Sequence, residues 1–89
     1  MVKSPKKRPD LTCELLDEEL VIFDPLLNVT HRLNPTASFV FDSCDGTATP
    51  RTIIREYEEF FNVDSDTAEK DVNQVLSLLQ RLRLIDQLS

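Results

Sequence analysis

Glycine is nearly absent from this chain of 89 residues, which has Gly46 as its one example, and tryptophan is absent altogether. A single glycine excludes a glycine-rich phosphate loop, because such a loop needs several positions where the backbone approaches the phosphate closely. Two cysteines are too few for a disulfide scaffold. One histidine, with no CxxC or HxxxH spacing, leaves a structural zinc site without ligands. We therefore expect no metal and no cofactor.

Long apolar runs are also missing. The longest, Leu20–Phe23, is far shorter than the roughly 20 residues of a membrane span. Ten Lys and Arg against sixteen Asp and Glu give a net charge of −6, which repels phosphate backbones and anionic lipids. No apolar signal core follows the N-terminus. We expect a small cytoplasmic protein with neither a nucleic acid nor a membrane as its partner.

Positive charge is concentrated in the first ten residues, which also contain two prolines. A segment of this composition buries too little apolar surface to offset its ordering entropy. We predict a flexible basic arm over residues 1–10 and a single domain over residues 11–89. A role in solubility and a specific basic contact both remain open for the arm.

The next part of the chain alternates apolar and polar residues, which is the pattern of half-buried strands. The alternating segments cover residues 11–15, 20–23 and 29–33. An acidic break separates the first two, and Pro25 lies in the second break, where it fixes φ and removes a ladder donor. We predict a three-stranded antiparallel meander.

After Leu33 the apolar period changes to that of helices, predicted over residues 35–44, 50–61 and 66–83. Asn34 and Thr49 each precede a proline, which predicts a cap followed by the first helical position. The run from Asp66 to Glu69 resembles a capping box. The predicted fold class is therefore α+β, with an N-terminal sheet followed by three helices.

Candidate catalytic groups are few. Cys44 and His31 are the one possible pair of nucleophile and base. Cys44 shares the apolar stripe of its helix with Val40 and Phe41, which favours a buried, inert thiol. His31 shares a strand face with apolar neighbours, which favours a structural or contact role. We do not expect an enzyme.

The third predicted helix has a narrow apolar face with Leu78 at its margin, beside Asp71 and Gln74. Together with Val75 and Leu82, this margin forms either one wall of a shallow apolar groove or a surface that packs under the strands. If the third strand is also a sheet edge, its free backbone groups can bind an extended peptide by strand addition.

Several segments of the chain together resemble the PqqD family, the precursor peptide recognition elements of ribosomally made, post-translationally modified peptides (RiPPs). The resemblance covers roughly residues 7–86, and its most specific parts are the segments 33–36 (Leu-Asn-Pro-Thr) and 44–46 (Cys-Asp-Gly). Two positions depart from the family pattern. Phe41 occupies a position where tryptophan is common, and Arg83 occupies the position of a glycine that usually precedes the last apolar pair.

The resemblance implies a winged-helix-like domain without catalytic activity. Family members bind the leader segment of a precursor peptide, which adds to the third strand and lies against the third helix. They then deliver it to a modifying enzyme, often a radical SAM protein, or in lasso peptide pathways to a leader peptidase. Carried over by position, the implied peptide-binding residues are Val29, Thr30, His31, Arg32 and Leu33 on the strand and Asp71, Gln74, Val75, Leu78 and Leu82 on the helix.

Two other functions remain as alternatives. A winged-helix DNA-binding regulator is disfavoured because the third helix begins with three acids against one lysine, the wrong sign for a phosphate groove. A small structural subunit of a larger enzyme would share the exposed apolar margin. The sequence leaves open the precursor, the enzyme, the oligomeric state and the role of Leu26 and Leu27, which fit a dimer contact, an enzyme contact or a lid on the sheet.

Overall fold

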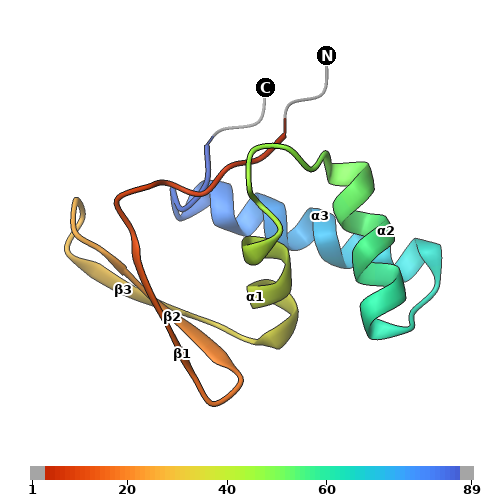
Figure 1. Cartoon of the computed structure of the whole chain (residues 1–89), viewed down its shortest axis with the longest axis horizontal. Helices are drawn as coiled ribbons and strands as arrows, with labels where there is room; N and C mark the ends of the chain where they lie inside the picture. The colour runs from red at the N-terminus through yellow and green to blue at the C-terminus, as the bar shows by residue number, and fades with distance from the viewer. Residues whose placement is uncertain (1–3, 87–89) are drawn as a thin grey trace.

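The computed structural model describes residues 4–86, and in it three strands are followed by three helices (Figure 1). The strands are β1 (Thr12–Leu16), β2 (Glu19–Asp24) and β3 (Val29–Leu33). The helices are α1 (Pro35–Asp42), α2 (Pro50–Phe61) and α3 (Ser65–Arg81). The α+β class and the antiparallel meander predicted from the sequence are confirmed. Within residues 4–86, none of the helices has the length and apolar character that a membrane crossing requires.

Two of the three predicted helix starts are confirmed by their caps. The Asn34 side chain accepts a hydrogen bond from the Ala37 N–H, and Thr49 caps α2 in the same way. The predicted capping box is wrong, because α3 begins earlier and Asp64 is its cap, accepting from the Thr67 N–H at 2.7 Å. The first helix is shorter than predicted, since it ends at Asp42.

The sheet has the order β1-β2-β3, so β1 and β3 are its edges. In the register, Leu20 lies opposite Leu33 and Ile22 opposite His31, which places these four side chains on one face. Helix α1 packs against this sheet through β2 and β3. It also packs against α2 and α3, whose backbones do not approach the strands as closely. Figure 1 shows α1 between the sheet and α2, while the C-terminal end of α3 extends past α1.

The core lies where α1 meets these neighbours. Phe41, in the position of the family's tryptophan, is 1% exposed, so phenylalanine fills this site. The apolar stripe predicted for the third helix is buried at four of its positions, whereas Val75 and Leu82 are half-buried beside the core. The fully buried large apolar side chains are Phe41, Ile22, Ile53, Leu79, Leu84, Val40 and Val72.

The segment from Ser4 to Asp10 packs against the rest of the domain, which differs from the flexible arm expected over residues 1–10. Lys6 forms an antiparallel bridge with Asp45, and Lys7 forms one with Ile85. The Gly46 N–H donates to the Pro5 carbonyl at 2.9 Å. These backbone contacts depend on segments distant in the chain, so the composition of the first ten residues gave no sign of them. Met1–Lys3 lie outside the described residues.

Gly46 is required where this N-terminal segment crosses the end of α1. Its φ is +88°, a left-handed conformation that side-chain-bearing residues rarely adopt. A Cβ atom here would lie 3.2 Å from the Lys6 side chain. The single glycine of the chain therefore allows both the turn after α1 and the close approach of the N-terminal segment.

Arg8 links the N-terminal segment to two other parts of the fold. Its guanidinium donates two hydrogen bonds to the buried carboxylate of Asp24, at 2.8 and 3.0 Å. It also pairs with Asp10 at 2.6 Å and donates to the Arg83 carbonyl at 2.9 Å. One side chain thus connects the end of β2 to the segment that follows α3.

Asp24 also organises the turn between β2 and β3. Its side chain is fully buried, and one of its oxygens accepts the N–H groups of Leu26 and Leu27 at 3.0 and 3.1 Å. The hydrogen bonds from Arg8, assisted by these two N–H donors, hold the pKa of Asp24 below its ordinary value despite burial. The break predicted at Pro25 is therefore fixed by a charged side chain.

The end of α3 adopts a Schellman motif although it lacks glycine. The Arg83 N–H donates to the Gln80 carbonyl and the Leu84 N–H donates to the Leu79 carbonyl, at 3.0 and 2.9 Å. This geometry needs a left-handed residue, and Arg83 supplies it with a φ of 60°. Arginine at the family's glycine position therefore keeps the turn and directs buried Leu84 into the core.

Replacing Arg83 with glycine should raise stability by about 1 kcal/mol, because glycine adopts the left-handed conformation without the Cβ clash. The Arg83 carbonyl that accepts from Arg8 is retained in this variant. The measurement is urea unfolding followed by circular dichroism. Arg81→Gly is the matched control. Because Arg81 is the last residue of α3, this change should lower the free energy of unfolding by about 0.5–1 kcal/mol. Equal or lower stability for Arg83→Gly would contradict the strain assigned to Arg83.

Replacing Asp24 with asparagine should lower the Tm at pH 7 by at least about 5 °C, because Arg8 then loses its buried carboxylate partner and keeps only the exposed Asp10. The pKa of this carboxyl group is lower in the folded state than in the unfolded state, where it is about 3.9. The carboxylate therefore stabilises the fold fully at pH values above about 3.9, and this stabilisation is lost as the pH falls through the pKa of the folded state. The Tm difference between the two proteins should therefore shrink between about pH 4 and pH 2.

The check is thermal unfolding across this pH range. Glu69→Gln, which makes the same change of charge at an exposed position of α3, is the control and should leave the Tm nearly unchanged. A difference between Asp24→Asn and the parent that does not vary with pH would show that the carboxylate charge is not what Asp24 contributes.

Candidate functional site

The outer edge of β3 is the first element of the candidate site. Within residues 4–86, β3 pairs with β2 along one side, and no strand pairs with its other side. Edge strands present unpaired backbone N–H and C=O groups, to which an extended peptide can bind. The backbone of α3 does not approach β3 closely, so the free edge of β3 is not covered by this helix.

The five predicted residues of this strand point to different faces of the sheet. His31 and Leu33 lie on the face shared with Ile22, and Leu33 is 2% exposed, so it belongs to the core. Thr30 and Arg32 lie on the opposite face, where the Arg32 guanidinium is 3.6 Å from the Glu19 carboxylate. Val29, at the start of the strand, is exposed. The strand therefore offers its backbone edge as a unit but not all five of its side chains.

The first turn of α1 and the exposed side of α3 enclose a hollow of about 340 Å³, named here the first hollow. Four of the five predicted helix residues line it, and Leu82 does not. Leu78 lines this hollow, which is the position expected of a groove wall. The lining residues are Asn34, Thr36, Ala37, Tyr57, Asp71, Gln74, Val75 and Leu78.

Tyr57 and Asp71 form one end of the first hollow. The Tyr57 hydroxyl donates a hydrogen bond to Asp71 Oδ2 at 3.0 Å, and the tyrosine is 2% exposed. Burial, with a further contribution from Asp71, raises the pKa of Tyr57. The neutral hydroxyl therefore holds the Asp71 carboxylate in one position. The sequence showed Tyr57 only as part of the apolar stripe of α2, so its contact with the groove was missed.

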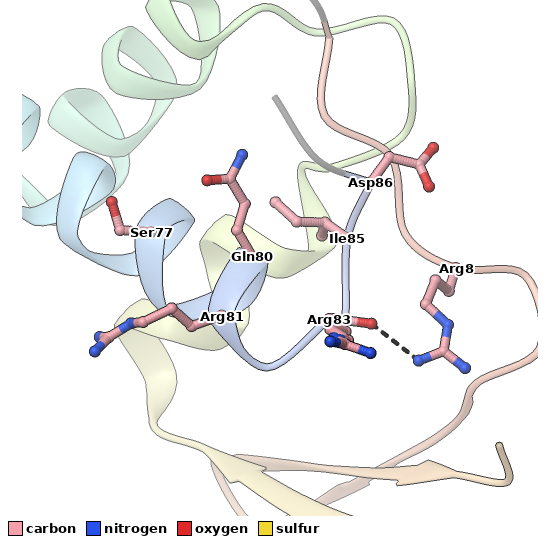
Figure 2. Close-up of a pocket in the computed structure, with 7 residues that line it drawn as sticks. All are labelled: Arg8, Ser77, Gln80, Arg81, Arg83, Ile85 and Asp86. Carbon is pink, nitrogen blue, oxygen red and sulfur yellow. Dashed lines mark hydrogen bonds between the residues drawn. The ribbon is translucent and has the colours of Figure 1, made fainter. Parts of the chain in front are cut away.

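Two further hollows continue the first one along α3. The middle hollow, of about 520 Å³, is lined by Asn73, Gln74, Ser77, Leu78 and Arg81. It shares Gln74 and Leu78 with the first hollow. The arginine pocket, of about 780 Å³, shares Ser77 and Arg81 with the middle hollow and lies at the end of α3 (Figure 2). Its lining residues are Arg8, Ser77, Gln80, Arg81, Arg83, Ile85 and Asp86.

The two candidate catalytic side chains are not arranged as a nucleophile and a base. Cys44 is fully buried just after α1, and its Sγ donates to the Val40 carbonyl at 3.2 Å. Burial raises the pKa of this thiol to about 12, so it stays protonated at neutral pH. His31 Nε2 is also buried and has no hydrogen-bond partner within residues 4–86. Within the same range, no three His, Cys, Asp or Glu side chains are grouped as metal ligands.

An aromatic hollow of about 390 Å³ lies between the β1–β2 turn, α1 and the end of α2. Phe60 is 68% exposed beside it and stacks on Phe39 with ring centroids 4.8 Å apart. Leu15 is exposed on the same hollow. Three carboxylates share its lining, which consists of Leu15, Asp17, Glu18, Pro35, Ser38, Phe39, Asp42, Phe60 and Phe61.

Three solved structures share this fold. "TbiB1 in Complex with the TbiA(beta) Leader Peptide" has 20% identity and a TM-score of 0.80, over 91% of this chain and 94% of that chain. "Lasso peptide synthetase B1 complexed with the leader peptide" has 18% identity and a TM-score of 0.81, over 94% and 99%. The PqqD truncation of Methylobacterium extorquens PqqCD, described as a stand-alone RiPP recognition element, has 20% identity and a TM-score of 0.75, over 93% and 88%.

These likenesses confirm the expected winged-helix-like fold. No curated protein sequence matches the chain. The family model described as "Coenzyme PQQ synthesis protein D (PqqD)" matches residues 19–85, from the start of β2 to the segment after α3. Because this match covers most of the sequence, including β3, α1 and α3, the chain belongs to the PqqD family.

Proposed function

We propose that this protein is a non-catalytic adaptor that binds the leader segment of a ribosomally made precursor peptide and presents it to a modifying or leader-cleaving enzyme. The observation that carries the proposal is the free edge of β3, whose last residue, Leu33, is followed directly by Asn34 of the first hollow. Two of the structurally similar proteins are described as complexes with a leader peptide. Membership of the PqqD family supports the same role.

In the proposed complex, the leader adds as a fourth strand along β3. Backbone hydrogen bonds to Val29–Leu33 supply affinity that depends little on sequence. Because side chains alternate along a strand, every second leader side chain points toward α3. There Val75 and Leu78 offer apolar contact, while Asp71 and Gln74 offer polar contact at the rim. The first hollow thus selects side chains, and the strand edge binds the backbone.

The side chains of β3 take different parts in this proposal. His31 Nε2 is a buried polar atom without a partner in residues 4–86, and we assign it a hydrogen bond to the leader. Leu33 supports the edge from the core, and Leu82 supports α3 beside the core. Arg32 lies on the sheet face away from α3, so we assign its charge to a flanking leader residue rather than to one inside the hollow.

The enzyme partner belongs to the proposal as well, either a radical SAM protein or a leader peptidase. The aromatic hollow supports a presenting role, because it shares no lining residue with the three hollows along α3. Its exposed Phe60 and Leu15 suit an apolar contact, and Asp17, Glu18 and Asp42 suit a basic partner surface. An enzyme bound there leaves the leader groove accessible.

The DNA-binding alternative receives no support from the structure. The start of α3 carries exposed Asp66 and Glu69 and half-buried Asp71 against Lys70, which would repel a phosphate backbone. A purely structural subunit shares the exposed apolar surfaces but has no use for a free strand edge beside a hollow. The experiment below distinguishes all three functions.

The test is to pass a lysate of the source organism over the immobilised protein and to identify what it retains by mass spectrometry. The parent should retain a short precursor peptide. Leu78→Asp should reduce that retention at least tenfold, because it places a charge in the first hollow. Leu26→Asp is the matched control, since Leu26 is 76% exposed in the β2–β3 turn, and it should retain the peptide as the parent does.

Circular dichroism and thermal unfolding of both variants show whether they remain folded. Equal retention by the parent and Leu78→Asp would contradict the groove. Retention of a large protein alone would indicate a structural subunit. Retention of DNA that is lost steeply with added salt would indicate a regulator.

A further inference from the structure

The arginine pocket at the end of α3 has a charge opposite to that of the whole protein. Three of its seven lining residues are arginines, whereas the chain has a net charge of −6. Figure 2 shows Arg81, Arg83 and Arg8 along one side of the pocket and Ser77, Gln80 and Asp86 on the other. The pocket continues the groove along α3, because it shares Ser77 and Arg81 with the middle hollow.

The three arginines are not equally available to a ligand. Arg8 is already paired with Asp24 and Asp10. Arg81 and Arg83 are exposed, and neither forms an ion pair with a residue in the range 4–86. Asp86 is the one carboxylate among the lining residues, and it forms no ion pair with them. Two guanidinium groups of the pocket are therefore free to bind an anion.

The backbone that carries Arg83 is held firmly. Its N–H donates to the Gln80 carbonyl, and its own carbonyl accepts from Arg8 at 2.9 Å. The side-chain amide nitrogen of Gln80 is buried and has no hydrogen-bond partner within the described range. The exposed guanidinium groups of Arg81 and Arg83 are donors that no carboxylate of the described residues neutralises, which suits the oxygens of a carboxylate ligand.

We propose that the arginine pocket binds an aspartate or glutamate side chain of the leader peptide, which rests on the leader-binding function proposed above. Guanidinium groups bind carboxylates through paired hydrogen bonds, so Arg81 and Arg83 give both affinity and orientation. The opposite end of the groove carries Asp71, fixed by Tyr57, and repels a carboxylate. The two ends thus differ in charge and set the direction in which the leader lies.

The helix also sets the spacing of this contact. Asp71 and Arg81 are ten residues apart on α3, which corresponds to roughly 15 Å along the helix axis. An extended peptide spans that distance with about five residues. We therefore expect the acidic leader residue about four to five positions from the residue that lies nearest Asp71.

The first experiment selects binders from a random library of 12-residue peptides displayed on phage, with the full chain immobilised at low salt. Enriched sequences should share Asp or Glu at one position, about four to five residues from an apolar position. One enriched peptide is then synthesised with its acidic residue intact and with the Glu→Gln or Asp→Asn change. The neutral peptide should bind the parent about five- to tenfold more weakly in fluorescence anisotropy.

Arginine variants identify the partner of that acidic residue. Arg81→Ala and Arg83→Gly should each weaken binding of the acidic peptide about fivefold and leave binding of the neutral peptide unchanged. Arg83→Gly is informative because its fold is expected to be more stable, so unfolding does not explain weaker binding. Arg55→Ala is the control, since Arg55 is exposed on α2 and lines none of the three hollows along α3.

The failures of the two proposals are distinguishable. Peptides that bind the parent, fail to bind Leu78→Asp and show no acidic preference would overturn the arginine pocket as a carboxylate site while leaving leader binding intact. Equal effects of Arg81→Ala, Arg83→Gly and Arg55→Ala would overturn it as well. A library that yields no peptide specific for the parent would overturn both proposals.

Discussion

The ion pair between Arg8 and Asp24 is the interaction on which the arrangement of the site depends. It joins the N-terminal segment to the end of β2, and through the Arg83 carbonyl it reaches the segment that follows α3. Asp24 also fixes the turn that leads into β3. Because the carboxylate is fully buried, its charge needs the guanidinium beside it. This one ion pair thereby fixes the position of the start of β3 relative to the end of α3.

Helix α1 provides the second constraint, because it packs on the sheet and on the other helices at once. Strand β3 and helix α3 both pack on α1, and their backbones do not approach each other closely. A free strand edge and an apolar helix face usually cover one another in a small domain, since both are costly to leave exposed. Here α1 holds them apart, and the first hollow lies between the start of α1 and α3. The function proposed for the chain uses this separation.

Arg83 shows how one residue can serve the fold and the proposed site together. The Schellman turn needs a left-handed residue, for which glycine is the usual choice. Arginine adopts that conformation at some cost, since its φ is 60°, and places a cation at the end of the groove. The opposite end has the buried Tyr57 hydroxyl on the Asp71 carboxylate. In the proposed complex, the groove therefore carries a positive charge at one end and a negative charge at the other. A uniformly apolar groove would not distinguish the two directions in which a leader can lie.

The sequence by itself determined the order of strands and helices, two of the helix caps and the helix residues that line the first hollow. These features depend on the period of the apolar residues and on neighbouring residues in the chain, such as Asn34 and Pro35. They can therefore be predicted from short stretches of sequence. The structure alone decided that residues 4–10 pack on the domain, that Tyr57 holds Asp71 and that Leu33 lies in the core. Each of these depends on contacts between segments far apart in the sequence, where neither composition nor period carries information about which partner a side chain meets.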